Sequence, residues 1–192
     1  MTLLILGLIL FLATHSLRIA APDWRQRQIA RLGVMPWRGL ISLASLAALL
    51  LIIWGFRQAG AEPITLYRPP LWLKHLAIAL TLPAFLLLAA AFVPGNSLKA
   101  RFGHPMVLGV KIWAFAHLLA NGAAHHLLLF GTLLLWSAVS FASARRQDRR
   151  QGLTRQLGEV RRNLFVLIAG LAAWALVALL LHGWVIGVRP FA

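Results

Sequence analysis

The chain alternates between long apolar runs and short, arginine-rich connectors. A transmembrane α-helix needs roughly 20 consecutive, mainly apolar residues, within a range of about 17–25. Six stretches approach this length, over residues 2–21, 38–56, 70–93, 105–121, 126–144 and 163–187. Only 12% of the residues are charged, whereas the share in a typical soluble domain is about 25%. We therefore predict an all-α, polytopic membrane bundle of about six transmembrane helices, forming a single domain over residues 1–192 in a lipid bilayer.

The distribution of basic residues predicts how these helices are oriented. Lys and Arg together number 19, against 4 Asp and Glu. Of the basic residues, 14 lie in the connectors around residues 18–38, 99–101 and 145–162. Cytoplasmic loops of membrane proteins carry an excess of Lys and Arg, so both termini are predicted to lie outside the cytoplasm. We interpret the basic blocks as topology signals that attract anionic lipid headgroups, and not as a nucleic-acid site.

Two stretches of the chain depart from the simple alternation of apolar runs and short connectors. Lys111 and His117 interrupt residues 105–121, so five helices cross if this segment only enters the membrane. Residues 144–162 form the longest polar stretch and are predicted to make a short amphipathic helix on the membrane surface.

The composition also limits the chemistry. The chain has no cysteine, which excludes disulfides, iron–sulfur clusters, thiolate nucleophiles and covalent haem attachment through C-x-x-C-H. The four acidic residues lie in connectors, so paired-carboxylate catalysis and a carboxylate proton relay inside the membrane are not expected. Histidine is the chemically versatile residue left inside the apolar runs.

Three of the seven histidines are the main candidates for metal ligands, because an ionisable group inside a span marks a functional site by default. His15 has Arg18 one turn further on, so a metal ligand beside a partner for a haem propionate is one interpretation. An interhelical hydrogen bond beside an ordinary interfacial arginine is an equal alternative. His117 shares a helix face with Trp113 and Asn121, which suits a cofactor wall or a polar helix–helix contact. His75 lies one turn inside the third segment.

The other histidines are given structural roles. His104 precedes Pro105 and is predicted to cap a helix or lie in a loop. The adjacent His125 and His126 point in different directions on a helix, so they are not expected to chelate together. His182, near the end of the last span, is placed at the membrane interface.

Several motifs together resemble the NnrU family of bacterial membrane proteins. The most specific is RFGHPMVLGVKIWAFAHLLANG over residues 101–122, supported by THSLR at 14–18 and by the stretch 68–76. The C-terminal stretch 182–190 is a weaker match. Relatives of this family in plants and cyanobacteria include the haem-dependent zeta-carotene isomerase. The resemblance implies a multi-pass protein of the bacterial inner membrane, associated with nitrite and nitric oxide metabolism.

The resemblance also implies a cofactor. In the isomerase relatives two histidines hold a non-covalent haem b, and the matching positions here are His15 and His117. Arg18 and Lys111 are the implied partners of the propionates, with Trp113 and Asn121 in the haem wall. By depth in the membrane, counted at about 1.5 Å per residue, His15 lies some 20 Å from the outer face and His117 within about 8 Å. His75 is therefore kept as the alternative partner of His117.

Three functions follow as expectations. The first is a haem-b protein with bis-histidine iron, active in redox chemistry or in nitric oxide or nitrite metabolism, with nitric oxide as a candidate ligand. The second is a haem-dependent cis–trans isomerase of a carotenoid-like polyene. The isomerase relatives carry a cysteine three residues before the second histidine, where this chain has Ala114, so a switch from histidine to cysteine ligation is not expected. The third is a cofactor-free membrane factor that assists assembly of a partner complex.

Overall fold

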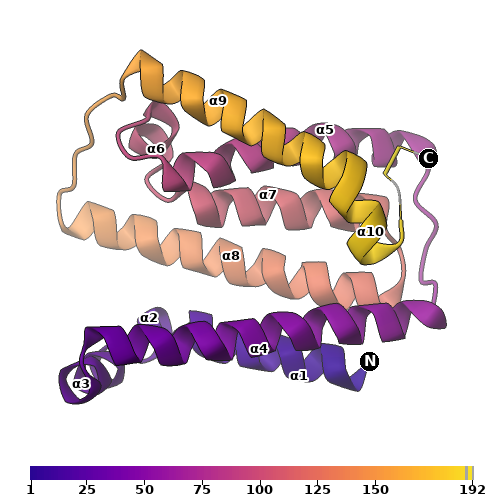
Figure 1. Ribbon diagram of the computed structural model, residues 1–192, viewed down its shortest axis with the longest axis horizontal. Coiled ribbons are helices and arrows are strands. Elements are labelled where there is room, and N and C mark those ends of the chain that lie inside the picture. Colours follow the sequence, from indigo (N-terminus) through magenta and orange to yellow (C-terminus); the bar gives the residue numbers. More distant parts are fainter. Residues whose placement is uncertain (189, 192) are drawn as a thin grey trace. The chain divides into compact units, whose positions relative to one another are not determined.

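A computed structural model describes residues 1–188 and 190–191, and in them it confirms the all-helical prediction. These residues contain no β-strand, and their one isolated bridge joins Thr65 to Ala123. In chain order (Figure 1) the elements are α1 (Thr2–His15), α2 (Leu17–Ala20), α3 (Pro22–Leu32), α4 (Val34–Ala61), α5 (Leu71–Phe92), α6 (Ser97–Phe102), α7 (Pro105–Ala120), α8 (Ala124–Arg150), α9 (Val160–Ala175), the π-helix η1 (Leu176–Leu181) and α10 (His182–Ile186).

Four helical stretches are long and apolar enough to cross a membrane. They are α4, α5, α8 and the continuous stretch Val160–Ile186. The apolar helices α1 and α7 have 14 and 16 residues, so at about 1.5 Å per residue they fall short of a hydrocarbon core about 30 Å thick. Each of the six predicted segments thus contains an apolar helix. Six full crossings and the side on which each terminus lies stay predictions.

The polar connectors differ from the prediction. Residues 144–162 do not form a separate amphipathic helix: α8 continues to Arg150, and residues 151–159 are not helical. Gly152 has a φ of 60°, a backbone conformation that favours glycine and ends the helix. A short basic helix is found instead between the first two apolar helices. This is α3, which starts at Pro22, where proline is favoured.

The helices group into two compact units, which we describe separately. Unit 1 comprises residues 1–65 and 123–129. In it α1 packs closely on α4 through Gly7 and Gly55. A Cβ on Gly7 would lie 2.8 Å from the backbone nitrogen of Ile52, and one on Gly55 would overlap the backbone of Leu4. Small residues at such crossings are typical of helix packing in membranes.

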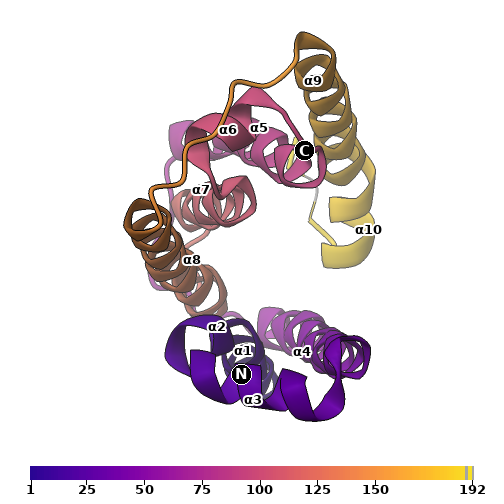
Figure 2. The ribbon, with the colours of Figure 1, turned by 90° about the vertical axis from the view of Figure 1, so that its left-hand side faces the viewer.

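Unit 2 comprises residues 66–122 and 130–192, and α5 is its central helix. Figure 2 shows α7 and α9 on different sides of α5, and both pack against it. A Cβ on Gly109 of α7 would lie 2.9 Å from the Ala84 carbonyl oxygen of α5. A Cβ on Gly170 of α9 would lie 2.6 Å from a methyl carbon of Leu86. Both neighbours of α5 therefore approach it through a glycine.

A polar cluster holds one end of unit 2 together. Asp148, at the end of α8, is 6% exposed and accepts hydrogen bonds from His104 Nε2 at 3.0 Å and from Arg155 Nη1 at 2.9 Å. His104 is the N-cap residue of α7, as predicted. A second contact of this kind joins α9 to α6: Asn163 Oδ1 accepts a hydrogen bond of 2.7 Å from the backbone N–H of Ser97. The Arg155 bond ties the non-helical residues 151–159 to the end of α8, and the Ser97 bond joins the start of α6 to α9.

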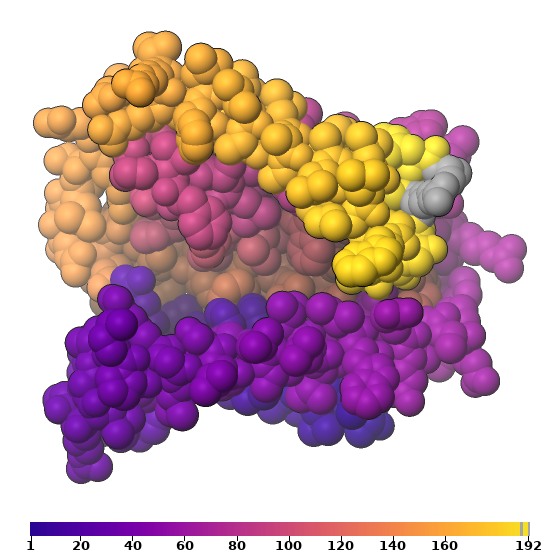
Figure 3. Space-filling model, in the orientation of Figure 1, coloured from indigo at the N-terminus to yellow at the C-terminus, as the bar shows by residue number. Residues whose placement is uncertain are grey.

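The outer surface of α9 and its continuation carries exposed apolar side chains. Figure 3 shows this surface in orange to yellow. Phe165, Ile168 and Leu180 are 61%, 58% and 65% exposed. Large apolar side chains exposed along one helical stretch are typical of an interaction site or of a helix that faces a membrane. Together with the four long apolar helices, it supports a membrane-embedded protein.

Candidate functional site

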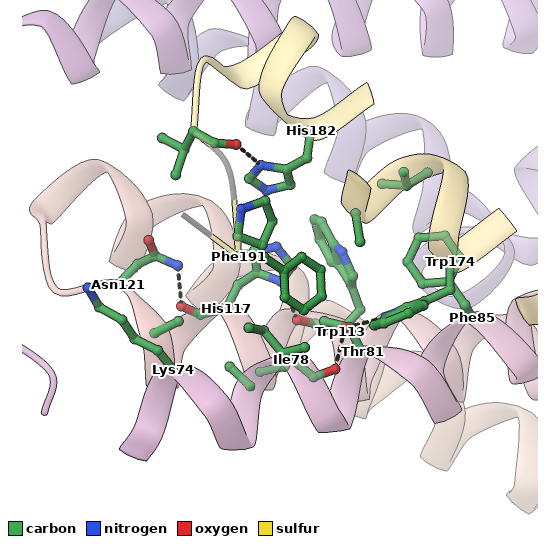
Figure 4. Close-up of a pocket in the computed structure, with 17 residues that line it drawn as sticks. Lys74, Ile78, Thr81, Phe85, Trp113, His117, Asn121, Trp174, His182 and Phe191 are labelled. Atoms are coloured by element: carbon green, nitrogen blue, oxygen red, sulfur yellow. Dashed lines mark hydrogen bonds between the residues drawn. The ribbon is translucent and has the colours of Figure 1, made fainter. Parts of the chain in front are cut away.

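Unit 2 contains a cavity of about 260 Å³ (Figure 4). Its walls come from α5, α7, the C-terminal helical stretch Val160–Ile186 and residues that follow this stretch. The lining residues are Lys74, Ala77, Ile78, Thr81, Phe85, Trp113, Ala116, His117, Ala120, Asn121, Trp174, Val177, Ala178, His182, Val188, Pro190 and Phe191. The lining is mostly apolar with a few polar groups, which is typical of a small-molecule site.

His117 enters the cavity from α7 with a fixed ring orientation. Its Nδ1 lies 2.8 Å from the carbonyl oxygen of Trp113. Because a carbonyl can only accept, Nδ1 is the donor and carries the proton of the neutral ring. The ring also packs on Trp113 and on Phe130, with both centroid distances 4.5 Å. Nε2 of His117 is therefore the unprotonated nitrogen and is suited to bind a metal.

His182 reaches the same cavity from the start of α10. Its Nδ1 lies 2.7 Å from the carbonyl oxygen of Val188, so this nitrogen too is a donor. The chain returns toward His182 because Gly187 has a φ of 84°, which only glycine adopts readily. The two imidazole centroids are 6.4 Å apart and their planes differ by 25°. The cavity thus contains two nearly parallel imidazoles, each anchored through Nδ1.

The ends of the cavity differ in polarity. Figure 4 shows Lys74 and Asn121 toward one end and Phe85 and Trp174 toward the other. Trp174 Nε1 donates a hydrogen bond of 2.9 Å to Thr81 Oγ1, which fixes the indole. Among the described lining residues, Lys74 is the single charged side chain. The cavity therefore offers one cationic end and one aromatic end.

The Asn121–Gly122 pair closes α7 beside the cavity. Asn121 Nδ2 donates to the carbonyl oxygen of His117 at 2.9 Å, and the Tyr67 hydroxyl donates to the carbonyl oxygens of Leu118 and Asn121. A Cβ on Gly122 would overlap the Tyr67 carbonyl. Glycine is required there because the loop before α5 passes directly over it.

The structure brings three of the predicted site residues together. His117, Trp113 and Asn121 all line the cavity. Lys111 is half-buried on α7 and His75 is exposed on α5, and neither is a lining residue.

The two remaining predicted residues lie in unit 1. Nδ1 of His15 is 3.0 Å from the Phe11 carbonyl oxygen, and its ring stacks on that of Phe11. Arg18 is in α2. Because His117 belongs to unit 2, the pairing of His15 with His117 stays a prediction.

Sequence reasoning missed His182 and Lys74 as cavity residues. Trp174 and His182 are eight residues apart, and in a regular α-helix they would diverge by about 80°. The wider turns of the π-helix Leu176–Leu181 return His182 to the side of Trp174. A π segment is not readable from apolar periodicity, although the weak motif match at 182–190 was a signal.

The donor set limits which metal group fits. The described residues contain no group of three or more His, Asp or Glu that could hold a metal ion. Two imidazoles fit a metal that brings its own equatorial ligands, as the iron of a porphyrin does. The aromatic walls and the single cationic end match the chemical character of the remainder of such a group, which is a flat apolar ring with acidic substituents.

Comparisons with known proteins gave one family. Neither the curated proteins nor the solved structures contain a significant match to the chain. The family model described as "NnrU protein" matches residues 3–190, nearly the whole chain. The chain therefore belongs to the NnrU family.

Proposed function

We propose that the protein is a haem-b-binding membrane protein of NnrU type, with bis-histidine iron and a role in redox chemistry or in nitric oxide or nitrite metabolism. His117 is one of the two iron ligands. The observation that carries the proposal is the state of this side chain: Nδ1 is held by the Trp113 carbonyl, and the ring lines an aromatic-walled cavity. Axial histidines commonly have this hydrogen bond, because it fixes the tautomer and makes the ligand nitrogen more basic.

The other cavity residues suit the rest of the cofactor. A porphyrin is flat and apolar except for its propionates. Trp113, Trp174 and Phe85 provide apolar walls, and the Lys74 ammonium provides a partner for a carboxylate. The bound iron would supply one-electron chemistry or, after loss of one ligand, a site for nitric oxide.

The isomerase alternative receives less support. Its relatives use a cysteine at the position of Ala114, which is fully buried in α7. Alanine has no group that can replace an imidazole on iron. We therefore place the redox or nitric oxide role first.

A visible spectrum tests the haem proposal. The protein, purified in mild detergent after haem-replete expression, is expected to show a Soret band that His117→Ala strongly reduces. His75→Ala is the matched control, because His75 is exposed and lies outside the cavity. A folded but colourless wild-type protein that takes up no haem would contradict the proposal and favour a cofactor-free assembly factor.

Two additions to the reduced, haem-loaded protein separate the haem functions. Nitric oxide is expected to shift the Soret band, and a cis-polyene is expected to give no trans product. Catalytic formation of trans-polyene would instead assign the protein as an isomerase.

A further inference from the structure

We propose that His182 is the second axial ligand of the haem iron, opposite His117. This inference rests on the proposed function, because it names the partner of the ligand assigned there. It departs from the pairs predicted from the sequence, which joined His117 to His15 or to His75.

The separation of the two rings fits one metal between them. An imidazole nitrogen binds a metal at about 2.0–2.1 Å and lies roughly 1.1 Å from its own ring centre, so two axial imidazoles have centroids roughly 6.3 Å apart. The centroids of His117 and His182 are 6.4 Å apart. The rings therefore need little change in separation to share one iron.

Both rings are also in the tautomer that ligation needs. His117 donates from Nδ1 to the Trp113 carbonyl and His182 donates from Nδ1 to the Val188 carbonyl. In each neutral ring this leaves Nε2 with a lone pair available to a metal. The backbone thus prepares two equivalent ligands without any help from a carboxylate.

Two backbone features place His182 in this position. The π-helix Leu176–Leu181 ends immediately before it, and π segments inside helices occur frequently at functional sites. Gly187 then adopts a φ of 84° and returns Val188 toward the ring. Figure 4 shows His182 on α10 with this hydrogen bond, and His117 on the opposite side of the cavity.

The test compares four single variants of the full chain: His182→Ala, His117→Ala, His15→Ala and His75→Ala. Each is loaded with haem in detergent and examined by absorption and by electron paramagnetic resonance of the ferric state. Wild type, His15→Ala and His75→Ala are expected to give a low-spin, six-coordinate spectrum. His182→Ala is expected to lose most of the low-spin signal and become high-spin, and added free imidazole should restore it.

A second substitution guards against a folding defect. His182→Met offers a thioether in place of the imidazole, and histidine–methionine ligation raises the reduction potential of a haem. We expect this variant to stay six-coordinate with a raised potential, while far-ultraviolet circular dichroism and gel filtration remain unchanged.

The outcomes separate the two proposals. If wild type binds no haem, the proposed function fails. If wild type binds low-spin haem, and His182→Ala keeps that spectrum while His15→Ala or His75→Ala loses it, the proposed function stands and the assignment of His182 is overturned.

Discussion

Both cavity imidazoles depend on a backbone carbonyl to fix the ring nitrogen that carries the proton. For His117 the carbonyl belongs to its own helix, four residues earlier. For His182 it belongs to Val188, beyond the end of α10. The His117 bond is maintained by regular helix geometry, whereas the His182 bond depends on how the chain turns at Gly187. Substitutions at Gly187 therefore test the hydrogen bond of His182, which regular helix geometry does not maintain.

Gly187→Ala is expected to weaken the site through backbone strain alone. A Cβ at residue 187 would meet nothing within 4 Å, so no steric clash is expected. The loss in folding free energy is the cost of a left-handed backbone for a residue with a Cβ, about 1–2 kcal/mol. We expect a lower midpoint of thermal unfolding and, in the haem-loaded protein, a smaller low-spin fraction. Gly131→Ala is the control, because it also meets nothing within 4 Å but lies inside α8. An effect of Gly131→Ala as large as that of Gly187→Ala would show that strain is not the cause.

At the scale of the helices, unit 2 depends on close approaches to α5. The cavity lies where α5 faces α7 and the C-terminal helical stretch, so the distance between these helices sets its width. Gly109 and Gly170 are the points at which side chains would separate them.

Gly109→Leu is expected to push α7 away from α5 and to lower stability by about 1–3 kcal/mol, the usual cost of overpacking. Because α7 carries His117, haem uptake should fall with it. Thermal unfolding in detergent and the Soret absorbance per protein measure the two effects. Gly131→Leu is the matched control, since nothing lies within 4 Å of a Cβ at that glycine. Equal losses in both variants would argue against helix spacing as the cause.

The elements also show where sequence reasoning succeeds. The length of the apolar runs predicts each of the apolar helices found in the described residues, because runs of leucine and alanine are sufficient for that. The His117 stripe with Trp113 and Asn121 was found because α7 is a regular helix. His182 is placed at the interface because it lies near the end of the last apolar run, and such a run does not reveal the π-helix η1 that immediately precedes it. Near the end of α8, Asp148 pairs with His104 and Arg155, and these contacts are not readable from the pattern of apolar residues.

At the scale of the whole molecule, the basic connectors predict a sidedness that can be tested directly. The chain has no cysteine, so a single introduced thiol can be labelled without background. Gln156→Cys lies in the exposed basic connector after α8, and Glu62→Cys lies in the exposed connector after α4.

A membrane-impermeant maleimide is expected to label Glu62→Cys in intact spheroplasts and Gln156→Cys only after permeabilisation. The reason is the positive-inside rule, which retains the arginine-rich connector in the cytoplasm. Labelling with a permeant reagent provides the control for thiol reactivity. The reverse pattern would place the arginine-rich connector outside the cytoplasm, and equal labelling of both sites would require an even number of crossings between them, as when the segment over residues 105–121 does not cross.

The cationic Lys74 at one end of the cavity and the indole of Trp174 at the other have a consequence for any guest. A flat molecule with acid groups along a single edge has one favourable orientation. Its acidic edge lies beside the Lys74 ammonium, and its apolar edge lies against the Trp174 indole. In the reversed orientation, the negative charge would lose its hydration against aromatic rings, and the Lys74 ammonium would have no acidic partner on the molecule. The polarity of the two ends therefore fixes the orientation of the bound molecule before an imidazole binds to it.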